Sequence, residues 1–222
     1  MLEKIKGGLV VSCQALPDEP LHSSFIMGRM ALAAYQGGAV GIRAQSKEDI
    51  AEINKTVDLP VIGIVKRNYP DSDIYITPTK KEIDELLTVR CEIIALDATR
   101  RKRPGGATIQ ELVDHIHANG RLAMADCSTL EECVDAEQYG FDITSTTLCG
   151  YTPYSVNVEG PNFDLIRQVV ERVHIPVIAE GKINTPEDLK KVYELGIWSA
   201  VVGGAITRPK QITERFVGIL NK

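Results

Sequence analysis

Short apolar runs alternate with longer amphipathic segments along the whole chain. The apolar runs predict buried strands, and the segments with apolar residues at helical spacing predict helices. The predicted strands cover residues 7–14, 39–43, 61–66, 91–98, 121–126, 141–147, 177–181 and 197–204. The predicted helices cover residues 23–35, 46–57, 108–120, 128–140, 161–174 and 182–196, and two more begin near Thr79 and Pro209.

Eight strands that alternate with about eight helices predict a parallel sheet of the α/β class. Eight such units favour closure into a (β/α)8 TIM barrel over an open doubly wound sheet. No charged linker or shift in composition divides the chain, so we expect residues 1–222 to form a single domain. The longest irregular segment, residues 148–161, predicts by its length a flexible flap over the functional site.

Polar residues or glycines end most of the predicted strands. In a closed barrel these ends meet at one mouth, so residues that are far apart in the sequence become neighbours. Strand ends also lie near solvent, so exposure alone can account for any single polar residue there, and no function is needed to explain it. As a set they are expected to do chemistry, and they comprise Gln14, Arg43, Lys66, Asp97, Asp126, residues 144–147, Glu180 and Gly203.

Lys66 and Glu180 are the candidates for acid and base chemistry. Lys66 shares a strand face with Ile62 and Ile64, and Glu180 shares one with Ile178. Burial lowers the pKa of an inward lysine, although a lysine that extends out of the mouth is the plainer alternative. The third and seventh strands lie opposite each other in an eight-stranded barrel, so these groups can flank a substrate and invert a carbon beside a carbonyl.

Two strands that end in glycine predict a phosphate site. Gly181 follows Glu180 directly, and Gly203 and Gly204 close the last strand. Backbone N–H groups can approach an anion there because no Cβ is in the way. Arg208, at the start of the next helix, can add a bidentate cation, and barrels often bind a substrate phosphate at this place.

Composition limits the possible partners and compartment. A net charge of −5 argues against nucleic acid as the main partner. No run of about 18 apolar residues and no signal-peptide pattern occurs, so we expect no membrane association and a cytoplasmic location. Five cysteines without C-x-x-C spacing predict reduced thiols rather than disulfides or a zinc cluster.

Patterns typical of other kinds of site are weak or absent in this sequence. The run RRKR at residues 100–103 resembles a nucleic-acid patch, but in an acidic chain it more often forms a solvated loop. No histidine stands at a predicted strand end, which disfavours a two-histidine metal site, although Asp97 and Asp126 could hold Mg²⁺. No G-x-G-x-x-G or Walker pattern occurs, so no nucleotide cofactor is expected.

Taken together, the motifs resemble the N-acylmannosamine-6-phosphate 2-epimerase family over essentially the whole chain. The resemblance rests on GGLVVSCQ, GAVGIR, PVIGIVKR, ALDATRRKRP, MADCST, GYT, PVIAEGKINTPED and AVVGGAITRP. It implies a (β/α)8 barrel that interconverts N-acetylmannosamine 6-phosphate and N-acetylglucosamine 6-phosphate in sialic-acid breakdown, without a redox cofactor. It also implies a homodimer.

The resemblance assigns a role to individual residues as well. It implies that Lys66 and Glu180 are the acid and base groups, and that the sugar or its phosphate is contacted by Gln14, Arg43, Asp126 and Arg208. The alternatives are another phosphosugar barrel, such as a pentose-phosphate epimerase or a ketose–aldose isomerase, and a non-catalytic phosphosugar-binding regulator. The sequence leaves open whether one base or two move the proton, and which group assists ring opening.

Overall fold

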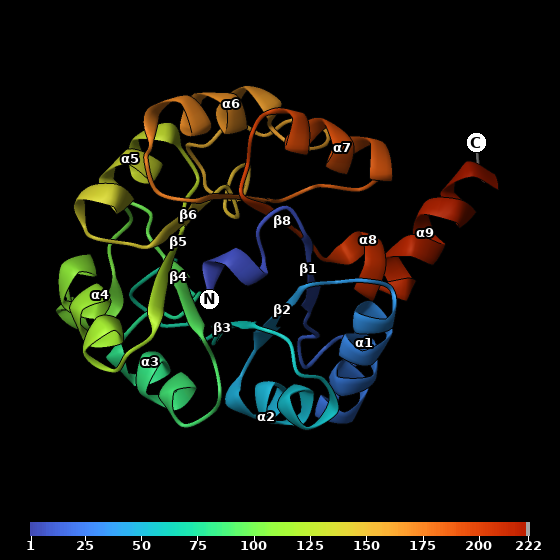
Figure 1. Cartoon of the computed structure of the whole chain (residues 1–222), viewed down its shortest axis with the longest axis horizontal. Coiled ribbons are helices and arrows are strands. Elements are labelled where there is room, and N and C mark those ends of the chain that lie inside the picture. Colours follow the sequence, from blue (N-terminus) through green and yellow to red (C-terminus); the bar gives the residue numbers. More distant parts are fainter. Residues whose placement is uncertain (221–222) are drawn as a thin grey trace.

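Eight parallel strands form a closed barrel in the order β1 to β8 (Figure 1). The structure is a computed structural model that describes residues 1–220. The strands are β1 Leu9–Cys13, β2 Gly41–Gln45, β3 Val61–Ile64, β4 Ile93–Asp97, β5 Leu122–Asp126, β6 Ile143–Ser145, β7 Val177–Glu180 and β8 Ser199–Val202. The (β/α)8 prediction is therefore confirmed, and the open doubly wound sheet is wrong.

Helices surround the barrel and return the chain from each strand to the next (Figure 1). They are α1 Ser24–Gln36, α2 Lys47–Thr56, α3 Lys80–Leu87, α4 Ile109–Ala118, α5 Leu130–Gln138, α6 Phe163–Arg172, α7 Pro186–Glu194, α8 Gly204–Thr207 and α9 Pro209–Leu220. Capping boxes define the first turns of α3, α4, α5 and α7, where a threonine side chain accepts a backbone N–H. Across residues 1–220, no helix is both long enough and apolar enough to cross a bilayer.

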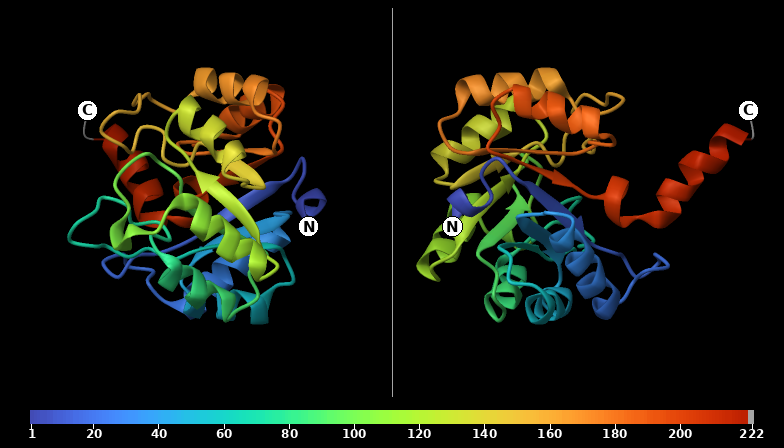
Figure 2. Two further views of the ribbon diagram at one scale, coloured as in Figure 1. Left: turned by 90° about the vertical axis from the view of Figure 1, so that its left-hand side faces the viewer. Right: turned by 45° about the vertical axis from the view of Figure 1, so that its right-hand side comes forward.

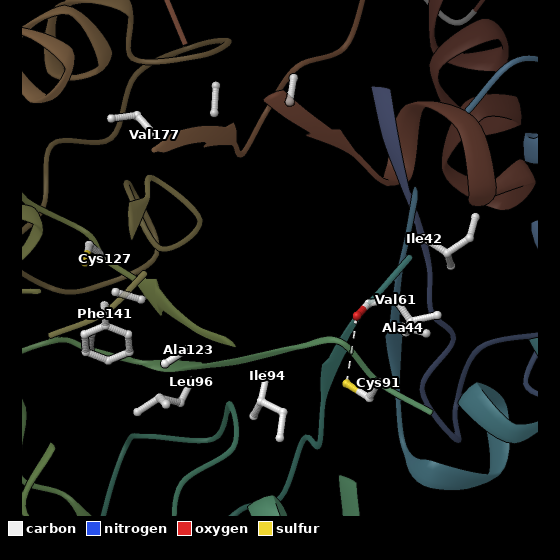
Figure 3. Close-up of a cluster of buried hydrophobic side chains, with 14 of the residues drawn as sticks. Ile42, Ala44, Val61, Cys91, Ile94, Leu96, Ala123, Cys127, Phe141 and Val177 are labelled. Carbon is white, nitrogen blue, oxygen red and sulfur yellow. Dashed lines mark hydrogen bonds between the residues drawn. The ribbon is translucent and has the colours of Figure 1, made fainter. Parts of the chain in front are cut away.

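The period of two along each strand divides the core into two layers. Side chains such as Ile62, Ile64 and Ile178 fill the barrel interior. Side chains such as Ile42 and Val61 point outward and pack under the helices, and Figure 3 shows this outer layer. The inward residues at the strand ends are polar, so the same alternation that fills the barrel also directs polar groups to its mouth.

The N-terminal residues close the floor of the barrel. The 3-10 helix η1 (Leu2–Lys4) leads into Ile5, which is 1% exposed and packs with the interior side chains. The indole N–H of Trp198 donates to the carbonyl of Leu2 at 3.2 Å, and the N–H of Gly7 donates to the carbonyl of Trp198 at 2.8 Å. The amino ends of the strands are thereby sealed, and the cavity opens at the carboxyl ends.

The last helix departs from the arrangement of the others. Helices α1 to α7 form a ring around the barrel, whereas α9 projects away from it (Figures 1 and 2). None of its residues is buried, and Phe216 and Ile219 are each 72% exposed. The helix predicted from about Pro209 is present, but its apolar face has no packing partner within residues 1–220.

Candidate active site

A cavity of about 650 Å³ opens at the carboxyl ends of the strands. Neighbouring strand ends are in register there: Ser12 lies beside Arg43, and Asp97 lies beside Asp126. Nine residues have an expected role in catalysis or in substrate or phosphate binding, and eight of them line the cavity, namely Gln14, Arg43, Lys66, Glu180, Gly181, Gly203, Gly204 and Arg208. The ninth, Asp126, is fully buried below its surface.

Arg43 lies between two carboxylates. Its guanidinium makes a two-point contact with Asp126, with Nη2 to Oδ2 at 2.5 Å and Nη1 to Oδ1 at 3.0 Å. Nη1 also donates to Oε2 of Glu180 at 2.7 Å. Arg43 is 1% exposed, and burial lowers its pKa, but the two carboxylates outweigh this effect and raise the pKa above its ordinary value, so Arg43 stays charged. The guanidinium fixes the carboxylate of Glu180 at the mouth. It also holds the buried carboxylate of Asp126, which does not line the cavity.

Thr147, one of the strand-end candidates at residues 144–147, lines the cavity. Its hydroxyl lies 2.9 Å from Oδ1 of Asp126 and 3.1 Å from Oε2 of Glu180, so it can donate to either carboxylate. The hydroxyl of Ser145 donates to Asp126 at 3.1 Å. Counting by two from Ile143 places both hydroxyls on the inward face. The carboxylate of Glu180 therefore has two donors, Arg43 and Thr147.

Lys66 and Glu180 come from opposite sides of the barrel. Glu180 ends β7, and Lys66 lies two residues beyond the end of β3. Burial, together with the charges of Arg43 and Arg208, lowers the pKa of Lys66 to about 8, and the charges of Glu180 and Glu19 oppose that change. Burial raises the pKa of Glu180 to about 7, and Arg43 opposes that change. Both groups can therefore give and take protons near neutral pH.

Three glycines, Gly181, Gly203 and Gly204, line the cavity after β7 and β8. Gly181 has φ of +110°, a conformation that other residues rarely adopt. A Cβ on Gly203 would lie 3.3 Å from Cβ of Ser12, and Gly204 begins the short helix α8. Arg208 follows α8 and lines the same cavity. These glycines offer backbone N–H groups close to the guanidinium of Arg208, and Arg215 lines the same cavity, a combination that suits a phosphate.

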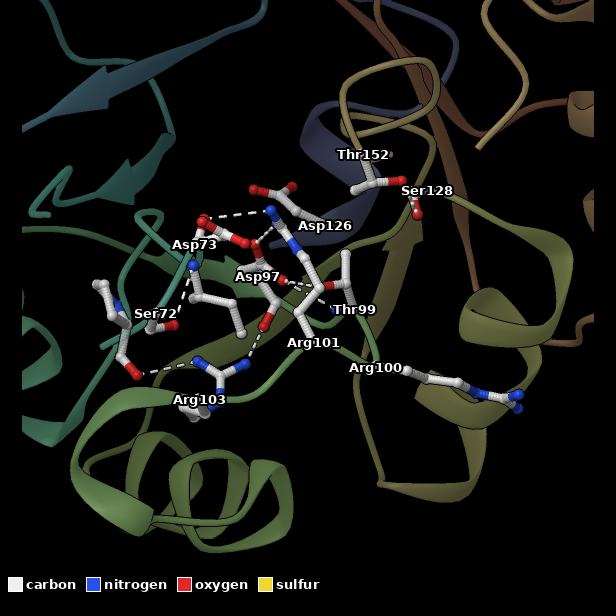
Figure 4. A network of polar contacts seen from close by, with 12 residues as sticks. Ser72, Asp73, Asp97, Thr99, Arg100, Arg101, Arg103, Asp126, Ser128 and Thr152 are labelled. Atoms are coloured by element: carbon white, nitrogen blue, oxygen red, sulfur yellow. Dashed lines mark hydrogen bonds and ion pairs between the residues drawn. The ribbon is translucent and has the colours of Figure 1, made fainter. Parts of the chain in front are cut away.

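Asp97 does not face the cavity, although it was a candidate ligand for Mg²⁺. Its Oδ1 accepts from the N–H and hydroxyl of Thr99 at 3.0 and 2.6 Å, and its Oδ2 accepts from Arg101 at 2.5 Å (Figure 4). Burial raises its pKa, and these donors oppose that change. No group of three or more potential metal ligands occurs in the part of the chain that the structure describes. The carboxylate of Asp97 holds the chain at the end of β4.

The expectation that residues 100–103 form a solvated loop holds for Arg100 and Lys102, which are exposed, and is wrong for Arg101 and Arg103. Arg101 also donates to the carbonyl of Asp73, and Arg103 donates to the carbonyls of Pro78 and Asp97 (Figure 4). These arginines connect the end of β4 to the segment after Lys66. The run therefore has a structural role that its charge pattern did not reveal.

The irregular segment 148–161 contributes Leu148 and Tyr151 to the cavity wall, as a flap would. It is also anchored on both sides. The hydroxyl of Tyr154 donates to the buried Glu132 at 2.6 Å, and the ammonium of Lys182 donates to the carbonyl of Val158 at 2.7 Å. These contacts hold segment 148–161 in a defined position over the site, although its length predicts a flexible flap.

Comparison with known proteins identifies the family that this chain is similar to. The sequence model of a family described as "Putative N-acetylmannosamine-6-phosphate epimerase" matches residues 27–222. A relative from Clostridium perfringens strain SM101 with that 2-epimerase description is 67% identical over 220 residues, which is 99% of this chain and 100% of the relative. One from Clostridioides difficile strain 630 is 65% identical over 217 residues, which is 98% of this chain and 97% of the relative.

Solved structures agree as well. The N-acetylmannosamine-6-phosphate 2-epimerase from Clostridium perfringens superimposes with a TM-score of 0.98 at 66% identity, over 99% of this chain and 96% of that one. A thiamine phosphate pyrophosphorylase from Pyrococcus furiosus has a TM-score of 0.62 at 24% identity, over 99% of this chain and 97% of that one, and shows the shared fold alone.

Barrel, site and relatives together define the class of this protein as a carbohydrate epimerase, an isomerase on a (β/α)8 scaffold. Within that class, the chain belongs to the N-acetylmannosamine-6-phosphate 2-epimerase family. The family resemblance expected from the sequence motifs is confirmed.

Proposed function

We propose that this chain interconverts N-acetylmannosamine 6-phosphate and N-acetylglucosamine 6-phosphate by removing and returning the proton at C2. The observation that carries the proposal is the pair of Lys66 and Glu180, which line one cavity from opposite strands with pKa values of about 8 and about 7. An epimerase needs a proton acceptor and a proton donor at the same carbon, and groups with such values can serve as either.

The chemistry requires the open-chain sugar. Only when C1 is an aldehyde is the C2–H bond acidic, because its electron pair can then move into the C1–C2 bond and place negative charge on the aldehyde oxygen. One group takes the proton from C2, and the enolate regains a proton on the opposite face. Arg43 keeps its charge beside Glu180 and supports this reaction by stabilising the developing negative charge.

Lys66 and Glu180 can divide this work in two ways. They can act from opposite faces as base and acid, or Lys66 can carry the proton to both faces while Glu180 assists at the sugar oxygens. Their places at the carboxyl ends of β3 and β7 support the first arrangement, and proton exchange by single variants separates the two. We propose that Asp126 acts through Arg43, since it contacts that guanidinium from below the cavity surface.

The rest of the cavity accounts for binding. We propose that Gly181, Gly203, Gly204 and Arg208 bind the phosphate, a role supported by the place of all four on the cavity wall, where the glycines carry no Cβ and Arg208 brings a guanidinium. Oε1 of Gln14 is buried and has no hydrogen-bond partner within residues 1–220. A donor on the sugar would satisfy it, which supports Gln14 as a substrate contact.

We further propose a homodimer and a role in sialic-acid breakdown in the cytoplasm. The exposed apolar residues of α9, among them Phe216 and Ile219, support association with a second copy, because an isolated helix gains little stability without packing. The five cysteines are buried and unpaired, which suits a reducing compartment.

Proton exchange tests the reaction directly. Product formed in D₂O from N-acetylmannosamine 6-phosphate should carry deuterium at C2, which NMR detects. Lys66→Ala and Glu180→Gln should each lower kcat by at least about a hundredfold. If the two groups serve opposite faces, each variant still exchanges the C2 proton of one epimer.

Three outcomes would contradict parts of the proposal. Full turnover without deuterium at C2 would refute proton transfer. Activity lost in EDTA and restored by Mg²⁺ or Zn²⁺ would favour a pentose-phosphate epimerase type of site. Tight phosphosugar binding without turnover would favour a non-catalytic regulator. Lys190→Ala, which removes a charge from the exposed surface of α7, is the control and should leave kcat unchanged.

A further inference from the structure

Arg208 has a carboxylate partner that the proposed reaction does not use. Nε of Arg208 lies 3.0 Å from Oε1 of Glu19, and Nη2 donates to Oε2 of Glu19 at 3.3 Å. The two contacts occupy one edge of the guanidinium in a side-on fork. Arg208 borders the main cavity and also a smaller one of about 330 Å³, which Glu19 lines. A carboxylate beside a proposed phosphate ligand requires an explanation, because it carries the same sign of charge as the phosphate.

The position of Glu19 is itself fixed. Its Oε2 accepts the N–H of Leu16 at 2.7 Å, and its own N–H donates to the carbonyl of Leu16 at 2.9 Å. The N–H of His22 donates to the carbonyl of Glu19 at 3.0 Å. The turn between β1 and α1 therefore holds this carboxylate in place with bonds that do not involve Arg208.

We propose that Glu19 is a positioning residue that holds Arg208 for phosphate binding. This inference rests on the proposed phosphate role of Arg208. Glu19 takes the edge formed by Nε and Nη2, and within residues 1–220 Nη1 has no hydrogen-bond partner. A long side chain that is already fixed loses less rotamer entropy when the phosphate binds, so the affinity for phosphate rises. A carboxylate that merely competed with phosphate would weaken binding instead.

The pair also acts on Lys66. The charge of Arg208 lowers the pKa of Lys66 and the charge of Glu19 raises it, alongside the lowering by Arg43 and the raising by Glu180. Glu19 therefore offsets part of the effect that Arg208 has on the amine. Without Glu19, the Lys66 ammonium should lose its proton at a lower pH.

Glu19→Gln tests the inference, with Asp18→Asn as the matched control. Asp18 is exposed in the same turn and forms no ion pair with Arg208. Asp18→Asn therefore removes the same charge without removing a contact of Arg208. Glu19→Gln should raise KM for the phosphosugar at least about fivefold, with kcat within about twofold of wild type. Inhibition by inorganic phosphate should weaken to a similar extent. The alkaline fall of kcat/KM should move to lower pH, and Asp18→Asn should change none of these quantities.

Arg208→Ala separates this inference from the proposed function. If Arg208→Ala leaves KM unchanged, the phosphate role of Arg208 is wrong. If Arg208→Ala raises KM but Glu19→Gln does not, or if Glu19→Gln lowers KM, the positioning role is wrong. In the double variant, the effect of Glu19→Gln should vanish, because its target is absent. Glu19→Asp keeps the charge but has a shorter reach, so it should also raise KM, and it serves if Glu19→Gln does not fold.

Discussion

Glu180→Gln should make the folded protein more stable at alkaline pH even though it removes a catalytic group. Burial raises the pKa of Glu180 from 4.5 to about 7. Between these two values the folded protein holds a proton that the unfolded chain has already lost. The free energy of unfolding therefore decreases as the pH rises through this window, and the ionised carboxylate costs stability above about pH 7.

The size of the effect follows from the pKa values. A difference of about 2.5 in pKa lowers the free energy of unfolding by about 3 kcal/mol above pH 7. Near pH 5 the free energy of unfolding is lowered by less than about 1 kcal/mol. Glutamine is neutral at both pH values and similar in size. Arg43 keeps its two-point contact with Asp126, and Thr147 can still donate to the amide oxygen. The stability of Glu180→Gln relative to wild type should therefore increase by about 2 kcal/mol between about pH 5 and about pH 8.

Urea unfolding of both proteins at the two pH values measures this difference. Glu131→Gln is the control, because Glu131 is exposed at the start of α5 and should give no gain that depends on pH. An equal difference in stability at both pH values would refute the burial argument. A variant that is less stable near pH 8 would show that the ion pair with Arg43 outweighs the cost of burying Glu180.

Two further predictions concern pH and association. The value of kcat/KM should rise through about pH 7 as Glu180 loses its proton and fall above about pH 8 as Lys66 loses its own, since the active pair shares one proton. A profile that stays flat from about pH 6 to about pH 9 would contradict both roles. Phe216→Glu and Ile219→Glu together should shift the protein to monomers in analytical ultracentrifugation, because each charge falls on the exposed apolar face of α9, while Lys210→Glu at the polar start of the helix should not; an unchanged dimer would place the interface elsewhere.

Strand periodicity predicted the barrel and most of the site. Ile62, Ile64 and Lys66 share a face in the sequence, and in the structure the two isoleucines fill the interior while Lys66 lines the cavity above them. Ile178 and Glu180 behave in the same way. The argument succeeds because the side chains of a strand alternate strictly, whatever its neighbours are.

Pairings between distant polar residues were beyond that argument. Sequence spacing does not show that Arg43 contacts both Asp126 and Glu180, since these residues come from three different strands. Nor does it show that Arg101 and Arg103 turn inward toward β4, because a run of charges has the same pattern whether it is solvated or paired. Such contacts depend on tertiary distances that only the closed barrel defines.

The sealed floor of the barrel determines where this enzyme can be attached to something else. Residues Leu2 to Gly7 bond to Trp198 at the amino ends of the strands, on the face opposite the cavity. A tag, linker or solid support joined before Met1 would therefore extend from the face of the protein that lies opposite the substrate entrance. The helix α9, in contrast, begins beside Arg208, and Gln211 and Arg215 of its first turns line the cavity, so a support attached to these turns would crowd the entrance. Immobilisation through the amino terminus should preserve turnover.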